Sequence, residues 1–173
     1  MDMYLQRLQD AITSATHGMD ITALTHCPEG KWCAAQVLEH LYLTYAGSVK
    51  GFERCLQEGR PLVHSVTLKE RLATLLVTEF GYFPEGRKAP ERTVPRGMAA
   101  EEVVKVIGEE LAAMDHLITQ CEIRFGRSTR ILDHPVLGPL TARQWRKFHL
   151  VHAQHHMKQI WKLRAGRGSQ VAE

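Results

Sequence analysis

The stretch from residue 100 to residue 125 reads AEEVVKVIGEELAAMDHLITQCEIRF. Its apolar residues recur at alternating steps of three and four, and Gly126 follows the last of them. This period is that of an amphipathic helix, and an unbroken 3-4 alternation is typical of helices packed in a bundle. We therefore expect a long bundle helix whose buried stripe is Val104, Ile107, Leu111, Met114, Ile118, Cys121 and Phe125.

The rest of the chain repeats this organisation, with helical periods that stop at or near glycines. Two starts carry capping boxes, Thr-Leu-Lys-Glu at Thr67 and Thr-Ala-Arg-Gln at Thr141. In such a box the first and fourth side chains satisfy backbone N–H groups of the first helical turn. We expect four further helices, at residues 2–17, residues 32–58, residues 67–81, and from residue 141 to just before Gly166.

These helices define the expected architecture, because no segment shows the sustained alternation of a strand. We predict an all-α protein: a four-helix bundle with an extra short helix. Residues 1–166 form a single bundle domain, and residues 167–173 form a flexible tail. The connections at 18–31, 82–99 and 127–140 are expected to be long loops, and loops of such length tend to be functional or disordered.

Composition narrows the class of protein. The chain has 173 residues, of which 44% are hydrophobic and 24% charged, with a formal net charge of +3. These values are ordinary for a soluble globular protein, and without a dense basic block they argue against nucleic acid as a partner. We see no apolar run that could cross a membrane and no secretory signal, so we expect a cytoplasmic protein. The cysteines are not in CxxC pairs and are expected to be free thiols: Cys27, Cys33, Cys55 and Cys121.

Residues 149 to 156, HLVHAQHH, concentrate histidines within the last helix. His152 and His156 are one helical turn apart, on the face that also carries Trp145 and Phe148. Two imidazoles at i and i+4 can converge on one metal ion, although core histidines satisfied by hydrogen bonds explain the pair about equally well. A metalloprotease of the HExxH type is excluded, because Ala153 stands where the glutamate is required.

A third histidine enters through a resemblance. The segment WCAAQVLEHL at residues 32–41, followed by HAQHHMKQI at 152–160, resembles the DinB/YfiT-like superfamily over essentially the whole chain. The loop HPVLGPLT at 134–141 resembles a subgroup of that superfamily whose function is uncharacterised. The resemblance implies a four-helix bundle that binds one divalent metal through His40, His152 and His156. On helix geometry alone, His40 is a surface residue.

The resemblance also implies a chemistry. Three neutral imidazoles leave a divalent ion with an open position, as in catalytic rather than structural sites. Imidazole suits several metals, and zinc and nickel are the ions that we expect first. Relatives include transferases that use low-molecular-weight thiols, so a metal-dependent thiol transferase acting on a small electrophile is expected, with a homodimer as the form in solution. A metal-dependent hydrolase and a non-catalytic metal- or ligand-binding bundle are the alternatives.

Several residues near the histidine motifs have secondary expectations. Gln36 and Gln159 are placed to orient ligating rings through their second nitrogens, or are ordinary surface glutamines. His149 is a candidate for such a supporting role, whereas His155 points about 100° away from His156 and does not fit the site. His134 either lines the pocket or serves a turn.

No general base is evident in the sequence. Glu39 is adjacent to His40 but points about 100° away on a helix. The loop at 82–99 is aromatic and then basic, and it is either a solvated surface loop or a site for an anion held by Arg87, Arg92 or Arg96.

Overall fold

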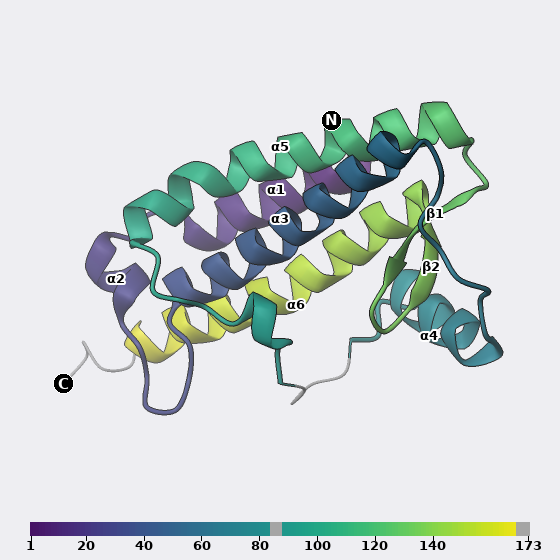
Figure 1. Cartoon of the computed structure of the whole chain (residues 1–173). Coiled ribbons are helices and arrows are strands. Elements are labelled where there is room, and N and C mark those ends of the chain that lie inside the picture. The colour runs from purple at the N-terminus through teal and green to yellow at the C-terminus, as the bar shows by residue number, and fades with distance from the viewer. Residues whose placement is uncertain (84–87, 169–173) are drawn as a thin grey trace.

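The computed structural model describes residues 1–83 and 88–168, and it is dominated by four long helices (Figure 1). α3 packs mainly against α5, and α1 mainly against α6. The expected four-helix bundle is confirmed. The long helices are α1 (Met3–Thr16), α3 (Ala34–Glu58), α5 (Ala100–Phe125) and α6 (Ala142–Gly168).

The ends of these helices follow from local chemistry. The side chain of Asp2 accepts a hydrogen bond from the backbone N–H of Tyr4 (2.8 Å) and caps α1. The predicted box at the start of α6 is present, since the backbone N–H of Thr141 donates to Gln144 Oε1 (3.0 Å). α3 ends at Gly59, whose φ of 69° is left-handed.

The stripe predicted for α5 is correct along most of the helix, with one change at its start. Val103 is fully buried, whereas Val104, predicted as a core residue, is 46% exposed. Both valines fit a 3-4 spacing before Ile107, so periodicity alone does not choose between them. From Ile107 to Cys121 the buried residues are those expected.

Shorter elements occupy all three connections that were expected to be loops. They are α2 (Ile21–Thr25), the 3-10 turn η1 (Glu91–Thr93), and an antiparallel hairpin of β1 (Arg130–His134) and β2 (Gly138–Thr141). The expected short helix is α4 (Leu68–Thr78). The prediction that the chain has no strands is therefore wrong for the hairpin. Its two strands are too short to show sustained alternation.

The hairpin is fixed to the bundle at Leu132. Its carbonyl accepts a hydrogen bond from Trp145 Nε1 on α6 (3.1 Å), and its side chain lies against Gly51 of α3. The hairpin and α4 lie together at one end of α6 (Figure 1). Residues of both elements line a cavity that also includes residues of α3 and α6.

The last helix continues beyond its expected end. It was predicted to stop before Gly166, but α6 extends to Gly168. Of the predicted tail at 167–173, residues 169–173 lie outside the described residues. Within the described ranges, none of the helices combines the length and apolar character needed to span a membrane.

Candidate metal centre

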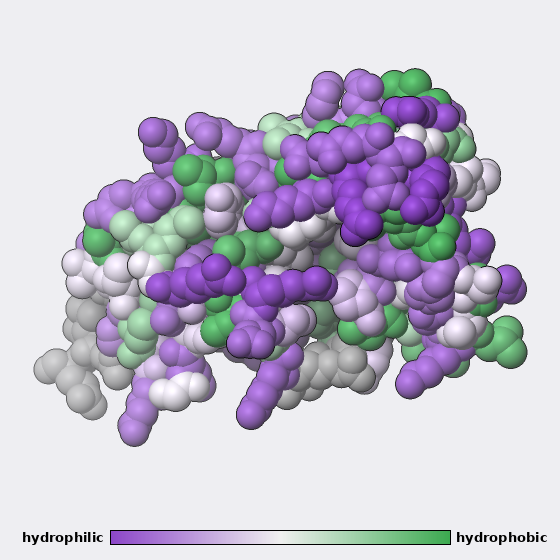
Figure 2. All heavy atoms as spheres, viewed as in Figure 1, coloured by the Kyte–Doolittle hydropathy of each residue, from purple (hydrophilic) through white to green (hydrophobic). Residues whose placement is uncertain are grey.

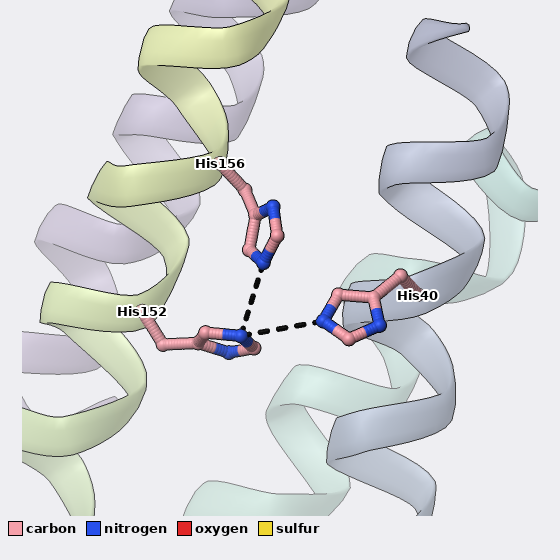
Figure 3. Close-up of side chains that lie close together, drawn as sticks. All are labelled: His40, His152 and His156. Atoms are coloured by element: carbon pink, nitrogen blue, oxygen red, sulfur yellow. Dashed lines mark hydrogen bonds between the residues drawn. The ribbon is translucent and has the colours of Figure 1, made fainter. Parts of the chain in front are cut away.

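Three histidines from two helices bring their Nε2 atoms together between α3 and α6 (Figure 3). His152 Nε2 lies 3.0 Å from His156 Nε2 and 3.3 Å from His40 Nε2. One ligand atom from each of the three lies within 4.8 Å of the others, and all three side chains are buried. The structure therefore assembles the histidines that the resemblance had named.

Hydrogen bonds on the far side of two rings determine which nitrogen carries the proton. His40 Nδ1 donates to the carbonyl of Thr93 in η1 (2.8 Å), and His156 Nδ1 donates to Gln159 Oε1 (2.9 Å). In a neutral imidazole with a proton on Nδ1, the Nε2 atom has a free lone pair. Both rings thus present lone pairs toward His152.

His152 cannot satisfy both lone pairs. A proton on its Nε2 could be donated to His40 or to His156, but not to both. Its Nδ1 is buried and has no hydrogen-bond partner within the described ranges. A cation shared by the three Nε2 atoms would satisfy every lone pair and leave Nδ1–H as the protonated nitrogen of His152. The donor set therefore fits a divalent metal ion.

The protonation states of the cluster also suit a metal. Burial lowers the pKa of His40 and lowers that of His156 to about 3. The pKa of His152 is lowered well below its usual range by burial and then by the charges of the other two rings. All three are neutral near pH 7, which is the form that binds metal.

Two of the secondary expectations can now be separated. We call His40, His152 and His156 the triad. Gln159 accepts a hydrogen bond from one of its rings, whereas Gln36 contacts none of them. The Gln36 side chain accepts a hydrogen bond from the backbone N–H of Cys33 (3.1 Å) and caps α3. His40, for which helix geometry suggested a surface position, is only 4% exposed because its side of α3 faces α6 and η1.

Sequence reasoning placed Phe148 on the same helical face as His152 and His156, but it missed the other groups that surround the three histidines. The carbonyl of Thr93 comes from a connection that was expected to be a loop. Phe148 stacks on His152 with ring centroids 5.5 Å apart, and Phe83 lies 5.2 Å from the same ring. Trp32 contacts His40 at 5.3 Å. These aromatic residues come from three segments that are far apart in the sequence. Their contacts with the histidines therefore depend on the tertiary fold.

The other two histidines of the stretch at residues 149–156, His149 and His155, lie outside the triad. His149 is fully buried, and its Nε2 lies 3.2 Å from Ser48 Oγ rather than against a triad ring. Burial lowers its pKa to about 3. His155 packs against Phe83 at 5.0 Å and lies outside the triad, as expected.

His134 serves a turn and also lines the cavity. Its Nδ1 accepts hydrogen bonds from the backbone N–H groups of Val136 and Leu137, both at 3.1 Å. Its ring packs on Phe148 with centroids 4.3 Å apart. Both expectations for this residue are therefore correct.

The triad lies on the wall of a large cavity between α3 and α6. Its volume is about 1780 Å³, and η1, α4 and the hairpin contribute to its lining. Among the described residues that line it, Asp133 is the one carboxylate, and its Oδ2 accepts from His64 Nδ1 (2.7 Å). Glu39 is buried elsewhere and accepts hydrogen bonds from the backbone N–H groups of residues 96–98. Neither carboxylate is placed as a general base.

A four-helix bundle that gathers three buried histidines between two helices is the architecture expected of the DinB/YfiT-like superfamily. The structure is similar to YfiT from Bacillus subtilis, which is described as a probable metal-dependent hydrolase with an unusual four-helix bundle topology. The TM-score is 0.59 at 17% sequence identity, covering 95% of this chain and 86% of that one.

The chain belongs to the family described as protein of unknown function (DUF1569), whose model matches residues 1–163. A comparison with curated proteins gave no match. The fold expected from the superfamily resemblance is thus confirmed. The subgroup inferred from the loop at 134–141 stays a prediction.

Proposed function

We propose that this protein is a metal-dependent enzyme that acts on small molecules, with a divalent ion held by His40, His152 and His156. The observation that carries the proposal is the convergence of three neutral imidazole Nε2 atoms, two of them with lone pairs fixed by outer hydrogen bonds. Zinc and nickel are the ions that we expect first, because both accept imidazole ligands.

The residues of the chain would hold and shield such an ion. Thr93 and Gln159 fix the rings of His40 and His156, and outer partners of this kind usually set ligand orientation. Phe83 and Phe148 cover His152 and exclude water from it. When bound, a divalent ion with three protein ligands supplies an open position that lowers the pKa of a coordinated water or thiol.

The reaction that we propose is the transfer of a low-molecular-weight thiol to a small electrophile. Cavities for one small ligand commonly measure about 300–1000 Å³. The cavity here, at about 1780 Å³, has room for a thiol and an electrophile together. The lack of a placed carboxylate base among the described lining residues fits a thiol, which loses its proton far more readily than water.

Hydrolysis is the second candidate, favoured by the description of YfiT as a probable metal-dependent hydrolase. An enzyme of this kind would use the same histidines with water in place of the thiol. A bundle that binds metal or ligand without catalysis is the remaining alternative. A cytoplasmic location and a homodimer also stay proposals.

The test is a conjugation and hydrolysis screen of untagged protein loaded with zinc or nickel. The thiol substrates are cysteine and glutathione with 1-chloro-2,4-dinitrobenzene, and the ester substrate is p-nitrophenyl acetate. We expect metal-dependent conjugation that is lost in His152→Ala and retained in His155→Ala. Ester hydrolysis with the same dependence would favour the second candidate, and silence with all substrates would contradict an enzyme of either kind.

A further inference from the structure

The wall of the cavity carries a strong excess of positive charge. Its one acidic residue among the described lining, Asp133, is already bonded to His64. Figure 2 shows strongly hydrophilic side chains lying across the face that carries η1, beside a recess. Six basic side chains line the cavity: Lys31, Lys50, Lys88, Arg92, Arg96 and Lys162.

Arg92 is the basic residue whose place relative to the triad is best defined. It belongs to η1 and precedes Thr93, the residue whose carbonyl holds His40. Burial and then the positive charge of Arg92 lower the pKa of His134 to about 4. Arg92 and His134, which belongs to the hairpin, line the same cavity. Within the described part of the chain, Arg92 forms no ion pair.

His134 adds a neutral donor to the lining of the cavity. Its Nδ1 accepts two backbone N–H groups, so the proton of the neutral ring is on Nε2. The ring lines the cavity, and Nε2–H is the donor that it can offer to a ligand. A guanidinium and an imidazole N–H that line one cavity can both donate to an oxyanion, and a hydrogen bond between a charged donor and an ionised acceptor is stronger than one between neutral groups.

Apolar surface lies beside these donors. Phe148 contacts both His134 and His152, with ring centroids 4.3 and 5.5 Å away. Phe83 approaches His152 from another segment at 5.2 Å. A ligand whose oxyanion met Arg92 would therefore lay its apolar part on these rings, next to the triad.

We propose that the cavity selects amphipathic organic anions: Arg92, assisted by His134, binds a carboxylate or phosphate, and Phe83 and Phe148 hold the apolar body. This inference deepens the proposed function and rests on it in placing the bound molecule at the triad. Arg92 is a specificity-determining residue in this account. Charge-assisted hydrogen bonds of guanidinium to carboxylate or phosphate are among the stronger polar contacts in proteins.

Two fluorescent probes with one ring system test the proposal. 8-Anilinonaphthalene-1-sulfonate carries an oxyanion, and N-phenyl-1-naphthylamine has the same rings without it. We expect Arg92→Gln to weaken binding of the sulfonate about tenfold, equivalent to about 1.4 kcal/mol, and to leave binding of the neutral probe unchanged. The control is Arg7→Gln, which removes an exposed cation of α1 that does not line the cavity and should change neither affinity.

The measurements are made on both EDTA-treated and zinc-loaded protein, so that failure of the metal site is distinguished from failure of the anion site. An Arg92 effect that persists without metal supports the anion site whatever becomes of the metal proposal. Equal weakening of both probes, or no weakening of the sulfonate, would overturn it.

Displacement of the sulfonate probe by octanoate and by octyl phosphate then separates a carboxylate from a phosphate as the preferred group. We expect at least one of the two to displace the probe at a lower concentration than octanol does. Displacement by octanol at the same concentration as both anions would overturn the proposal.

Discussion

At the scale of single residues, the chemistry of the triad depends on the groups that accept hydrogen bonds from the outer nitrogens of its rings. Thr93 and Gln159 accept protons from the Nδ1 atoms of His40 and His156. Without those acceptors, each ring could place its proton on Nε2 and point a donor rather than a lone pair at the centre. The outer hydrogen bonds therefore make the cluster a set of metal ligands rather than a polar patch.

Gln36 and Gln159, which the sequence suggests could each orient a ligating ring, differ in the structure and so can be compared as a pair of variants. Gln159→Leu removes the acceptor for His156 and should weaken metal binding by roughly 10- to 100-fold, the usual cost of losing an outer partner. Gln36→Leu should leave metal affinity unchanged and destabilise the protein by about 1 kcal/mol, because it removes a helix cap. Metal titration against a chelating dye and urea unfolding measure the two effects. Equal metal affinities in the two variants would contradict this assignment.

The buried histidines also predict how stability depends on pH. The folded pKa of His149 is about 3, below the unfolded value near 6.5, so the unfolded chain takes up a proton first as the pH falls. Its contribution to stability is full above about pH 6.5 and decreases by about 2 kcal/mol by pH 5. In EDTA, the free energy of unfolding of the wild type should therefore fall between pH 7 and pH 5 by about 2 kcal/mol more than that of His149→Leu. Urea unfolding at the two pH values measures the difference. A pH dependence equal to that of the wild type would show that His149 is accessible to protons.

The predictability of the site differs from residue to residue. The i, i+4 spacing placed His152 and His156 on one helical face, and Gln159 followed from the same helix. His40 could be added only through the family resemblance, since its own helix suggested a surface position. The carbonyl of Thr93 lies 53 residues further along the chain than His40, and no local pattern encodes a contact of that range.

At the scale of elements, the hairpin depends on close contact with α4. Gly138 has φ of 68°, and a Cβ built there would lie 2.5 Å from Glu70 Cδ. Glu70 cannot simply move, because its carboxylate accepts from the backbone N–H of Thr67 (2.8 Å) and lies 2.9 Å from His64 Nε2.

Gly138→Ala should therefore destabilise the protein by about 1–3 kcal/mol, the usual cost of a strained backbone at a non-glycine residue. The control is Gly108→Ala in α5, where a Cβ would meet nothing within 4 Å. Alanine has the higher helix propensity, so this control should be neutral or more stable by up to about 1 kcal/mol. Thermal unfolding compares the two, and equal stability of both variants would contradict the packing described for the hairpin.

Long elements were predictable and short ones were not. The stripes and capping boxes predicted each long helix to within a few residues, because many apolar positions repeat one period. The hairpin, α2 and η1 comprise three to five residues per element, which is too few to establish a period. These elements are held by contacts with the bundle, such as the hydrogen bond of Trp145 to the carbonyl of Leu132.

At the scale of the whole molecule, the cysteines report on folding and redox state. All four carry free thiols, and Cys27 is the exposed one, whereas the other three are buried. Burial raises the pKa of Cys33 and Cys55 and raises that of Cys121 to about 12, which suppresses their thiolates. Titration with a disulfide reagent should find one fast thiol in the native protein and four after unfolding. Two or none after unfolding would reveal a disulfide and contradict the expected reducing location.

The whole bundle also explains why the metal site is placed where it is. α3 and α6 each pack more extensively against another long helix than against one another. The space left between them holds both the cavity and the triad. The proposed function therefore depends on the space between α3 and α6.

Elemental analysis of untagged, purified protein measures directly whether the three histidines hold a metal ion. We predict close to one divalent ion per chain in the wild type, with most of it lost in His40→Ala, His152→Ala or His156→Ala. Affinity should also fall as the pH drops through the histidine range, because the ligands must be neutral. His149→Ala and His155→Ala should retain the metal, since neither belongs to the triad. A stoichiometry near zero after zinc or nickel loading, or equal losses across all five variants, would contradict the site and the enzyme proposed from it.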